Sequence, residues 1–288
     1  MRPTWHFVAP EDLRWLLALT APRVRQASAY QYRILELDRE TTRKSARVIE
    51  RALGGGVALT REELGERLRA AGIEATGLRL GYLVSDAELD GRICSGPRRG
   101  KRQTYALLEE RLPPAAPRTR DEALAEIGRR YVEGHGPAQV ADLAWWSGLT
   151  VADSRKALEL ATPPLATERV GERTFWRSPS APAVAIDSPV VHLLPNYDEL
   201  LISFRDREDA MDPGLPSAAR VAQVVLAHIV VRDGLVVGGY RRREEGGRTS
   251  LLVDLLVDLD SRERAGIRAA TERFGAFLGR RVEVAGLD

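Results

Sequence analysis

The feature that most constrains the fold is a pattern that this chain repeats. Helix-forming segments are followed by a basic hairpin that closes on an arginine, a threonine and an aromatic residue, first at Arg102-Gln103-Thr104-Tyr105 and again at Arg173-Thr174-Phe175-Trp176. Arg2-Pro3-Thr4-Trp5 has the same character with no helix before it. A chain of 288 residues built this way predicts several small domains, each with its own core.

Two proline-rich stretches, 112–117 and 178–182, have few apolar side chains to bury and are expected to be linkers. The segments that these linkers separate predict a mostly α fold with β wings, in which tandem winged-helix domains precede a small β-rich α+β domain. The expected parts are the terminal strand of a truncated first winged helix at 1–8, winged-helix domains at 9–111 and 119–178, and the α+β domain at 190–288.

The order of elements is the reason for this interpretation. Helices are expected from Pro10 to about Leu53 and again over 76–90, with a capping box of Thr60 and Glu63 between them. A hairpin over 93–108 completes the order helix, short strand, helix, helix, hairpin, which is that of a winged helix.

The same order returns in the next segment. Thr119 and Glu122 form a capping box, helices over 140–146 and 150–160 flank a glycine turn, and a second wing is expected over 166–177. Farther on, Asp233-Gly234 between apolar runs predicts a hairpin, and a helix is expected over 262–278.

Composition excludes several classes of protein. Uncharged runs such as 221–231 are too short to span a bilayer, and Arg2 and Glu11 lie where a secretory signal needs an apolar run. Cys94 is the only cysteine, so no disulfide can form within the chain. We therefore expect a cytoplasmic protein without a membrane partner.

Signatures of metal and cofactor sites are absent from the sequence. It contains neither a Walker loop nor a Gly-x-Gly-x-x-Gly run after a strand. The histidines lack the spacing of metal ligands and are His6, His135, His192 and His228. We expect no metal and no cofactor.

The first wing carries the clearest electrostatic signal. Five cations lie within eleven residues that contain no acid, and they are Arg92, Arg98, Arg99, Lys101 and Arg102. A basic hairpin of this kind suits phosphates or the minor groove, although a solvated turn is the alternative. The preceding helix carries Asp86, Glu88 and Asp90, so we expect the wing rather than that helix to touch DNA.

Other candidates are weaker. Arg155 and Lys156 in the second helix-turn-helix are compatible with DNA contact, whereas Arg241, Arg242 and Arg243 are offset by neighbouring glutamates. Trp145 and Trp146 are expected in the core rather than as stacking platforms. Asp198 and Glu199 could serve as a general base, but a structural turn with a solvated or salt-bridged acid is the favoured interpretation.

Together these residues resemble the bacterial winged-helix superfamily that includes the azinomycin-resistance DNA glycosylases and their crosslink-repair relatives. The resemblance spans essentially the whole chain and implies three tandem winged helices with a β-rich C-terminal region. The runs that carry it are 4–8 with 11–15, 93–98, 142–150, and 193–199 through 205–207.

Glycosylases of that superfamily are thought to release alkylated purines with a Gln-Φ-Gln or Gln-Φ-acid motif, where Φ is an apolar residue. None of the five glutamines here has a Gln, Asp or Glu two positions later, so the resemblance assigns no catalytic residue. In the family this motif precedes the segment that resembles Met1 to Val8. Either Met1 is an internal methionine, which the repeat favours, or the chain is a natural short form. If Met1 is internal, His6 would lie near that site, with a core or hydrogen-bonded histidine as the alternative.

The sequence thus predicts a monomeric protein that binds double-stranded DNA through its basic wings. Three alternatives stay open. The chain could belong to an N-glycosylase for alkylated or crosslinked purines, it could be a transcriptional regulator, which would be expected to dimerise, or its winged helices could hold a protein partner.

Overall fold

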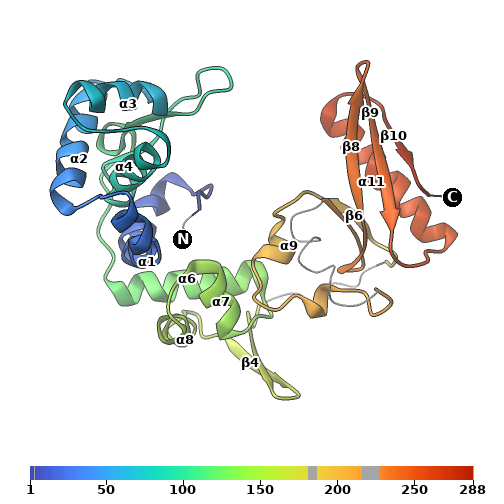
Figure 1. Ribbon diagram of the computed structural model, residues 1–288. Coiled ribbons are helices and arrows are strands. Elements are labelled where there is room, and N and C mark those ends of the chain that lie inside the picture. The colour runs from blue at the N-terminus through green and yellow to red at the C-terminus, as the bar shows by residue number, and fades with distance from the viewer. Residues whose placement is uncertain (3, 181–186, 216–227, 288) are drawn as a thin grey trace. The chain divides into compact units, whose positions relative to one another are not determined.

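A computed structural model describes residues 1–2, 4–180, 187–215 and 228–287 (Figure 1). The expected linker at 178–182 and the uncharged run at 221–231 lie partly outside these residues. The chain divides into two compact units, which are considered separately: Met1–Gly134 with Ser147–Leu165, and His135–Trp146 with Ala166–Asp288.

The first unit is mainly helical. Its core is formed by α2, α3 and α4, which bury Ile49, Leu64 and Leu83 together with Tyr105 from the hairpin. The helices are η1 (Pro10–Asp12), α1 (Leu13–Ile34), α2 (Arg39–Leu53), α3 (Arg61–Ala70), α4 (Gly77–Leu89), α5 (Leu108–Arg111), α6 (Arg120–His135, whose last residue falls in the second unit) and α8 (Val151–Glu159).

A three-stranded sheet completes this core. The short strand β1 (Leu59–Thr60) pairs antiparallel with β3 (Thr104–Leu107), which pairs antiparallel with β2 (Ile93–Ser95). Thr60 is also the N-cap of α3, and its capping box with Glu63 is present as predicted. The expected order of helix, strand, helix, helix and hairpin is therefore found between residues 39 and 107.

The helices α6 and α8 approach closely because α6 carries a glycine at their contact. A Cβ atom on Gly128 would lie 2.3 Å from the carbonyl oxygen of Ala157. The predicted caps at Thr119 and Thr150 are both confirmed, since each hydroxyl accepts the backbone N–H three residues later. The helix that begins after Thr119 continues three residues past its expected end at Val132.

The expected strand at residues 1–8 is not formed within the described residues there. A strand requires a neighbour for its backbone N–H and C=O groups, and the described residues of this segment pair with no strand. The segment is instead held by Trp5, whose Nε1–H donates to Glu88 of α4 at 3.2 Å.

The second unit contains α7 (Val140–Ser147, whose last residue falls in the first unit) and the hairpin of β4 (Ala166–Val170) and β5 (Arg173–Arg177). Its five-stranded sheet has the order β10-β9-β8-β7-β6, and α11 packs along it (Figure 1). The remaining elements are β6 (Val191–Leu194), α9 (Glu199–Ile202), η2 (Glu208–Ala210), β7 (His228–Arg232), β8 (Leu235–Glu245), β9 (Arg248–Leu255), α11 (Ser261–Leu278) and β10 (Val282–Ala285).

The predicted hairpin between β7 and β8 is confirmed. Asp233 and Gly234 both have positive φ, 51° and 85°, which is the backbone that a two-residue turn of this kind requires. Apolar side chains on both faces of the sheet are buried, with Val230 and Ile267 in one cluster and Ile229 with Leu201 in the other.

Candidate nucleic-acid interface

The first wing, defined as residues 93–107, presents three cations at its tip. The side chains of Arg98, Lys101 and Arg102 are exposed, and none of them has an ion pair within the part of the chain that the structure describes. Gly100 allows the tight tip because its φ is +61°. The tip thus offers three positive charges to an anionic partner.

The other two arginines of the predicted wing site are occupied by the protein itself. The guanidinium of Arg99 binds both carboxylate oxygens of Glu63, at 2.7 and 2.9 Å, and holds the pKa of that acid at about 2. Arg92 bonds to Glu50 at 2.7 Å and to Asp90 at 3.3 Å. These two arginines anchor the hairpin to the helices, so the available cations reduce to the three at the tip.

The acids at the C-terminal end of α4 are bound by side chains from the preceding segments of the chain. Asp86 is buried and accepts hydrogen bonds from Arg25 at 3.1 Å and from the Tyr32 hydroxyl at 3.0 Å. Asp90 pairs with the same arginine at 2.5 Å. Buried carboxylates require such partners, and here α1 supplies them. Burial and the adjacent Asp86 raise the pKa of Tyr32.

Glu88 is a titratable group whose environment the sequence gave no reason to single out. Burial raises the pKa of its carboxyl to about 7, although the hydrogen bond from Trp5 opposes that shift. Its charge also contributes to the raised pKa of Cys94 and of Tyr105, both of which lie on the hairpin strands, behind burial as the main cause. A carboxyl that titrates near neutrality therefore lies beneath the first wing.

The helix α8 carries the two other predicted cations, which differ in their partners. Lys156 pairs with Asp121 at 2.6 Å, whereas Arg155 is exposed and has no ion pair among the described residues. Asp153 of the same helix is bound to Arg120 at 2.9 Å. Arg155 is consequently the available cation of this helix.

The tryptophans before the turn belong to a polar cluster in the second unit. Trp146 donates to Glu199 at 3.1 Å, and the same carboxylate lies 3.3 Å from Nε2 of His135. Trp145 donates to the carbonyl oxygen of Ile202 at 3.0 Å and is 42% exposed. The prediction that Trp145 lies in the core is therefore wrong. Its indole N–H reaches a backbone carbonyl, as a buried indole N–H group usually does, but part of its ring stays at the surface.

Asp198 acts as a helix cap, since its carboxylate accepts the backbone N–H of Leu200 at 3.0 Å. The structure thus shows the turn that the sequence favoured over a general base. His6 bonds to Thr4 and to the carbonyl oxygen of Met1, both at 2.9 Å. In the described ranges no group of three His, Cys, Asp or Glu side chains is placed to hold a metal ion.

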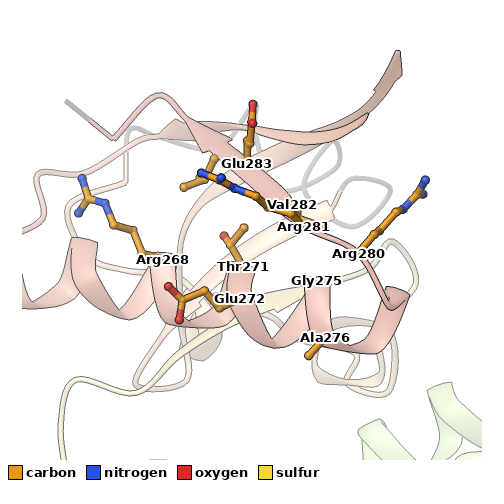
Figure 2. A pocket seen from close by; sticks show the side chains of 10 residues that line it. Arg268, Thr271, Glu272, Gly275, Ala276, Arg280, Arg281, Val282 and Glu283 are labelled. Atoms are coloured by element: carbon orange, nitrogen blue, oxygen red, sulfur yellow. The ribbon is translucent and has the colours of Figure 1, made fainter. Parts of the chain in front are cut away.

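A depression of about 710 Å³ lies between α11 and β10. Figure 2 shows that its arginines diverge, with Arg268 and Arg280 pointing in opposite directions, and that Glu272 and Glu283 lie among them. Cations interspersed with acids form a poor anion site. Arg242, in the same unit, already has partners within the protein: it bonds to Glu244, and its guanidinium lies over the ring of Phe274.

None of the described helices is both long and apolar enough to cross a bilayer. The family model described as DNA glycosylase AlkZ-like matches residues 1–277. Among solved structures, the DNA glycosylase AlkZ of Streptomyces sahachiroi is similar with a TM-score of 0.76 and 20% identity, over 99% of this chain and 80% of that one. At this identity the likeness establishes a shared fold of mixed helix and sheet. No curated protein matches the chain.

Proposed function

Because this chain belongs to the AlkZ-like DNA glycosylase family, we propose that it binds duplex DNA through the tip of the first wing. The observation that supports this most directly is the group of three exposed cations that have no ion pair among the described residues, Arg98, Lys101 and Arg102. Lysine and arginine on an exposed tip neutralise phosphates and release counterions, which gives binding that depends on salt rather than on sequence.

The architecture that we propose for this function is a tandem winged helix. Its domains would be residues 9–111 and 119–178, followed by an α+β domain at 190–288. The order of α2, β1, α3, α4 and the β2–β3 hairpin supports the first of these domains.

The experiment is a titration of labelled duplex DNA with the full chain, read by fluorescence anisotropy over about 50 to 200 mM salt. We expect affinity to fall steeply with salt, and the triple variant R98A/K101A/R102A to bind more weakly with a shallower dependence. Equal binding by the two proteins would refute the assignment of DNA to this wing.

A second candidate function is removal of alkylated purines, which family membership favours. The chain has no Gln-Φ-Gln or Gln-Φ-acid run, so no residue is assigned to that chemistry. The measurement is base release from alkylated duplex by this chain. Release above that of the protein-free duplex would establish an enzyme, and its absence alongside tight binding would support a binder.

A further inference from the structure

Three exposed arginines lie four residues apart along α2. They are Arg43, Arg47 and Arg51, and none of them has an ion pair among the described residues. Positions four apart are neighbours on one face of a helix, so these side chains form a row about 12 Å long, which we call the arginine stripe. The apolar side of α2, with Ile49 and Leu53, is buried in the core of the first unit, and the stripe is on its exposed side.

The stripe is unfavourable for α2 as a helix. Like charges at positions i and i+4 destabilise a helix, and the stripe contains two such pairs. The helix α6 uses arginine in the opposite way, because Arg129 bonds to Glu126 and Glu133 on the turns before and after it. Both helices belong to the same arginine-rich chain, so composition alone does not explain the unpaired arginines of α2.

The acids around α2 leave the stripe unpaired. Glu50 bonds to Arg92 at 2.7 Å, and Glu110 accepts two backbone N–H groups just beyond the C-terminal end of the helix. The acids at the N-terminal end line a hollow together with Lys44, and they are Asp38, Glu40 and Glu74. The stripe begins one turn after these acids, and its positive charge is available to a partner.

The chemistry of this surface fits phosphate groups. The helix α2 exposes no large apolar side chain, whereas the centre of a protein interface is apolar and anchored by large side chains. Arginine binds phosphate through a planar fork of N–H donors. One strand of duplex DNA carries a charge for about every 3.4 Å of its axis, so a stripe of about 12 Å is matched in length by about three or four phosphates.

The stripe and the tip of the first wing are separate surfaces of the first unit. In Figure 1 α2 lies at one edge of this unit, and the loop of the wing projects from the opposite edge, with α3 and α4 between them. The wing starts beside α2, where Arg92 bonds to Glu50, and its tip at Gly100 is the end of the hairpin remote from that contact. A phosphate backbone on the stripe is therefore distinct from one at the tip.

We propose that the arginine stripe binds the phosphate backbone of a second segment of duplex DNA, so that one molecule holds two segments at once. This inference rests on the proposed DNA-binding function and adds to it a second surface for the same partner. The wing engages one segment and the stripe engages the other, and contacts to phosphate select no base sequence.

The test compares the full chain with the stripe variant R43Q/R47Q/R51Q, the wing variant R98A/K101A/R102A and the control R120Q/R129Q/R173Q. The control loses the same charge from arginines that are paired with Asp153, Glu133 and Asp209. Sedimentation velocity with a labelled duplex of about 15 base pairs, about 50 Å long, counts the duplexes bound per chain at saturation. We expect two for the wild type and for the control, and one for the stripe variant and for the wing variant.

The variant R43K/R47K/R51K should still bind two duplexes, because lysine keeps the charge. The melting temperature of the stripe variant should not fall, because glutamine is a good helix former and its introduction removes repulsion between like charges. A lower melting temperature would assign the stripe to stability and count against the inference. If the stripe variant still binds two duplexes, or the wild type binds only one, the inference is wrong, and the proposed function stands as long as the wing variant is weakened. If the wild type binds no duplex, the proposed function fails as well.

Discussion

The two hairpins of this chain share a design but differ in the availability of their charges. In the first, none of the three cations at the tip has an ion pair among the described residues, whereas in the second Arg173 binds Asp209 at 2.6 Å and Arg177 lies 3.5 Å from Glu168, which leaves the exposed Arg169 as the cation of that hairpin without an ion pair among the described residues. The sequence predicts both hairpins to be basic wings. The comparison indicates that a cation is available to a ligand only when acids distant in the sequence leave it unpaired.

The largest effect that follows from this comparison concerns the first wing. We expect R98A/K101A/R102A to lower DNA affinity by roughly 10- to 100-fold near physiological salt, and to reduce the slope of log K against log[salt] by about 2 to 3, because about 0.9 counterion is released per phosphate contact. Anisotropy titrations across a salt series measure both quantities.

Retention of the native fold by the triple variant is expected, because all three side chains are exposed and make no ion pair among the described residues. Circular dichroism and thermal unfolding check this. A loss of affinity with an unchanged salt slope would contradict the phosphate assignment, since it would mean that the side chains act through something other than charge.

The hairpins also differ at their bases, because the first lies over Glu88 with its pKa near 7. The folded-state pKa is above the ordinary value, so the native state favours the protonated acid. The stability associated with that proton is complete below about pH 4.5 and is lost as pH rises toward 7, with a magnitude of about 1–3 kcal/mol.

The variant E88Q should remove this pH dependence while keeping an oxygen that accepts the Trp5 N–H. Urea unfolding at pH 5 and pH 8 is expected to show a loss of stability in the wild type that is smaller in E88Q by about 1–3 kcal/mol. Identical pH dependence in the two proteins would show that this carboxyl titrates at an ordinary pKa in the fold.

Much of the local structure could be predicted from the sequence. The capping boxes, the glycine turn and the Asp233-Gly234 hairpin are all signals that act over a few residues, and each one is found in the structure. The strand expected at the start could not be judged in the same way, because a strand depends on a partner that local sequence does not specify.

The candidate site was predicted less completely than the fold. Its five cations were correctly seen as clustered, but two of them are bound to Glu50 and Glu63, which lie 42 and 36 residues away. The orientation of Asp86 toward Tyr32 and the raised pKa of Glu88 also depend on tertiary contacts. Charge counting along a segment cannot reveal pairing of this kind.

A smaller effect is expected from releasing Arg99. The variant E63Q removes the ion pair but keeps the capping box, because glutamine serves at that position as well. Arg99 would then become a fourth available cation at the wing, and DNA affinity should rise by about two- to fivefold with a steeper salt slope. Weaker binding by E63Q would indicate that the ion pair holds the wing in its binding conformation.

The smallest effect is expected at the second wing, where R173A serves as a charge-matched counterpart of K101A. Each variant removes one positive charge, so their long-range influence on a polyanion is the same and is screened over about 10 Å at 0.1 M salt. Arg173 already binds Asp209, so its loss should change DNA affinity less than twofold, whereas K101A should lower it several-fold. A loss for R173A equal to that for K101A would mean that DNA displaces Asp209, and that paired cations contribute to binding as much as free ones.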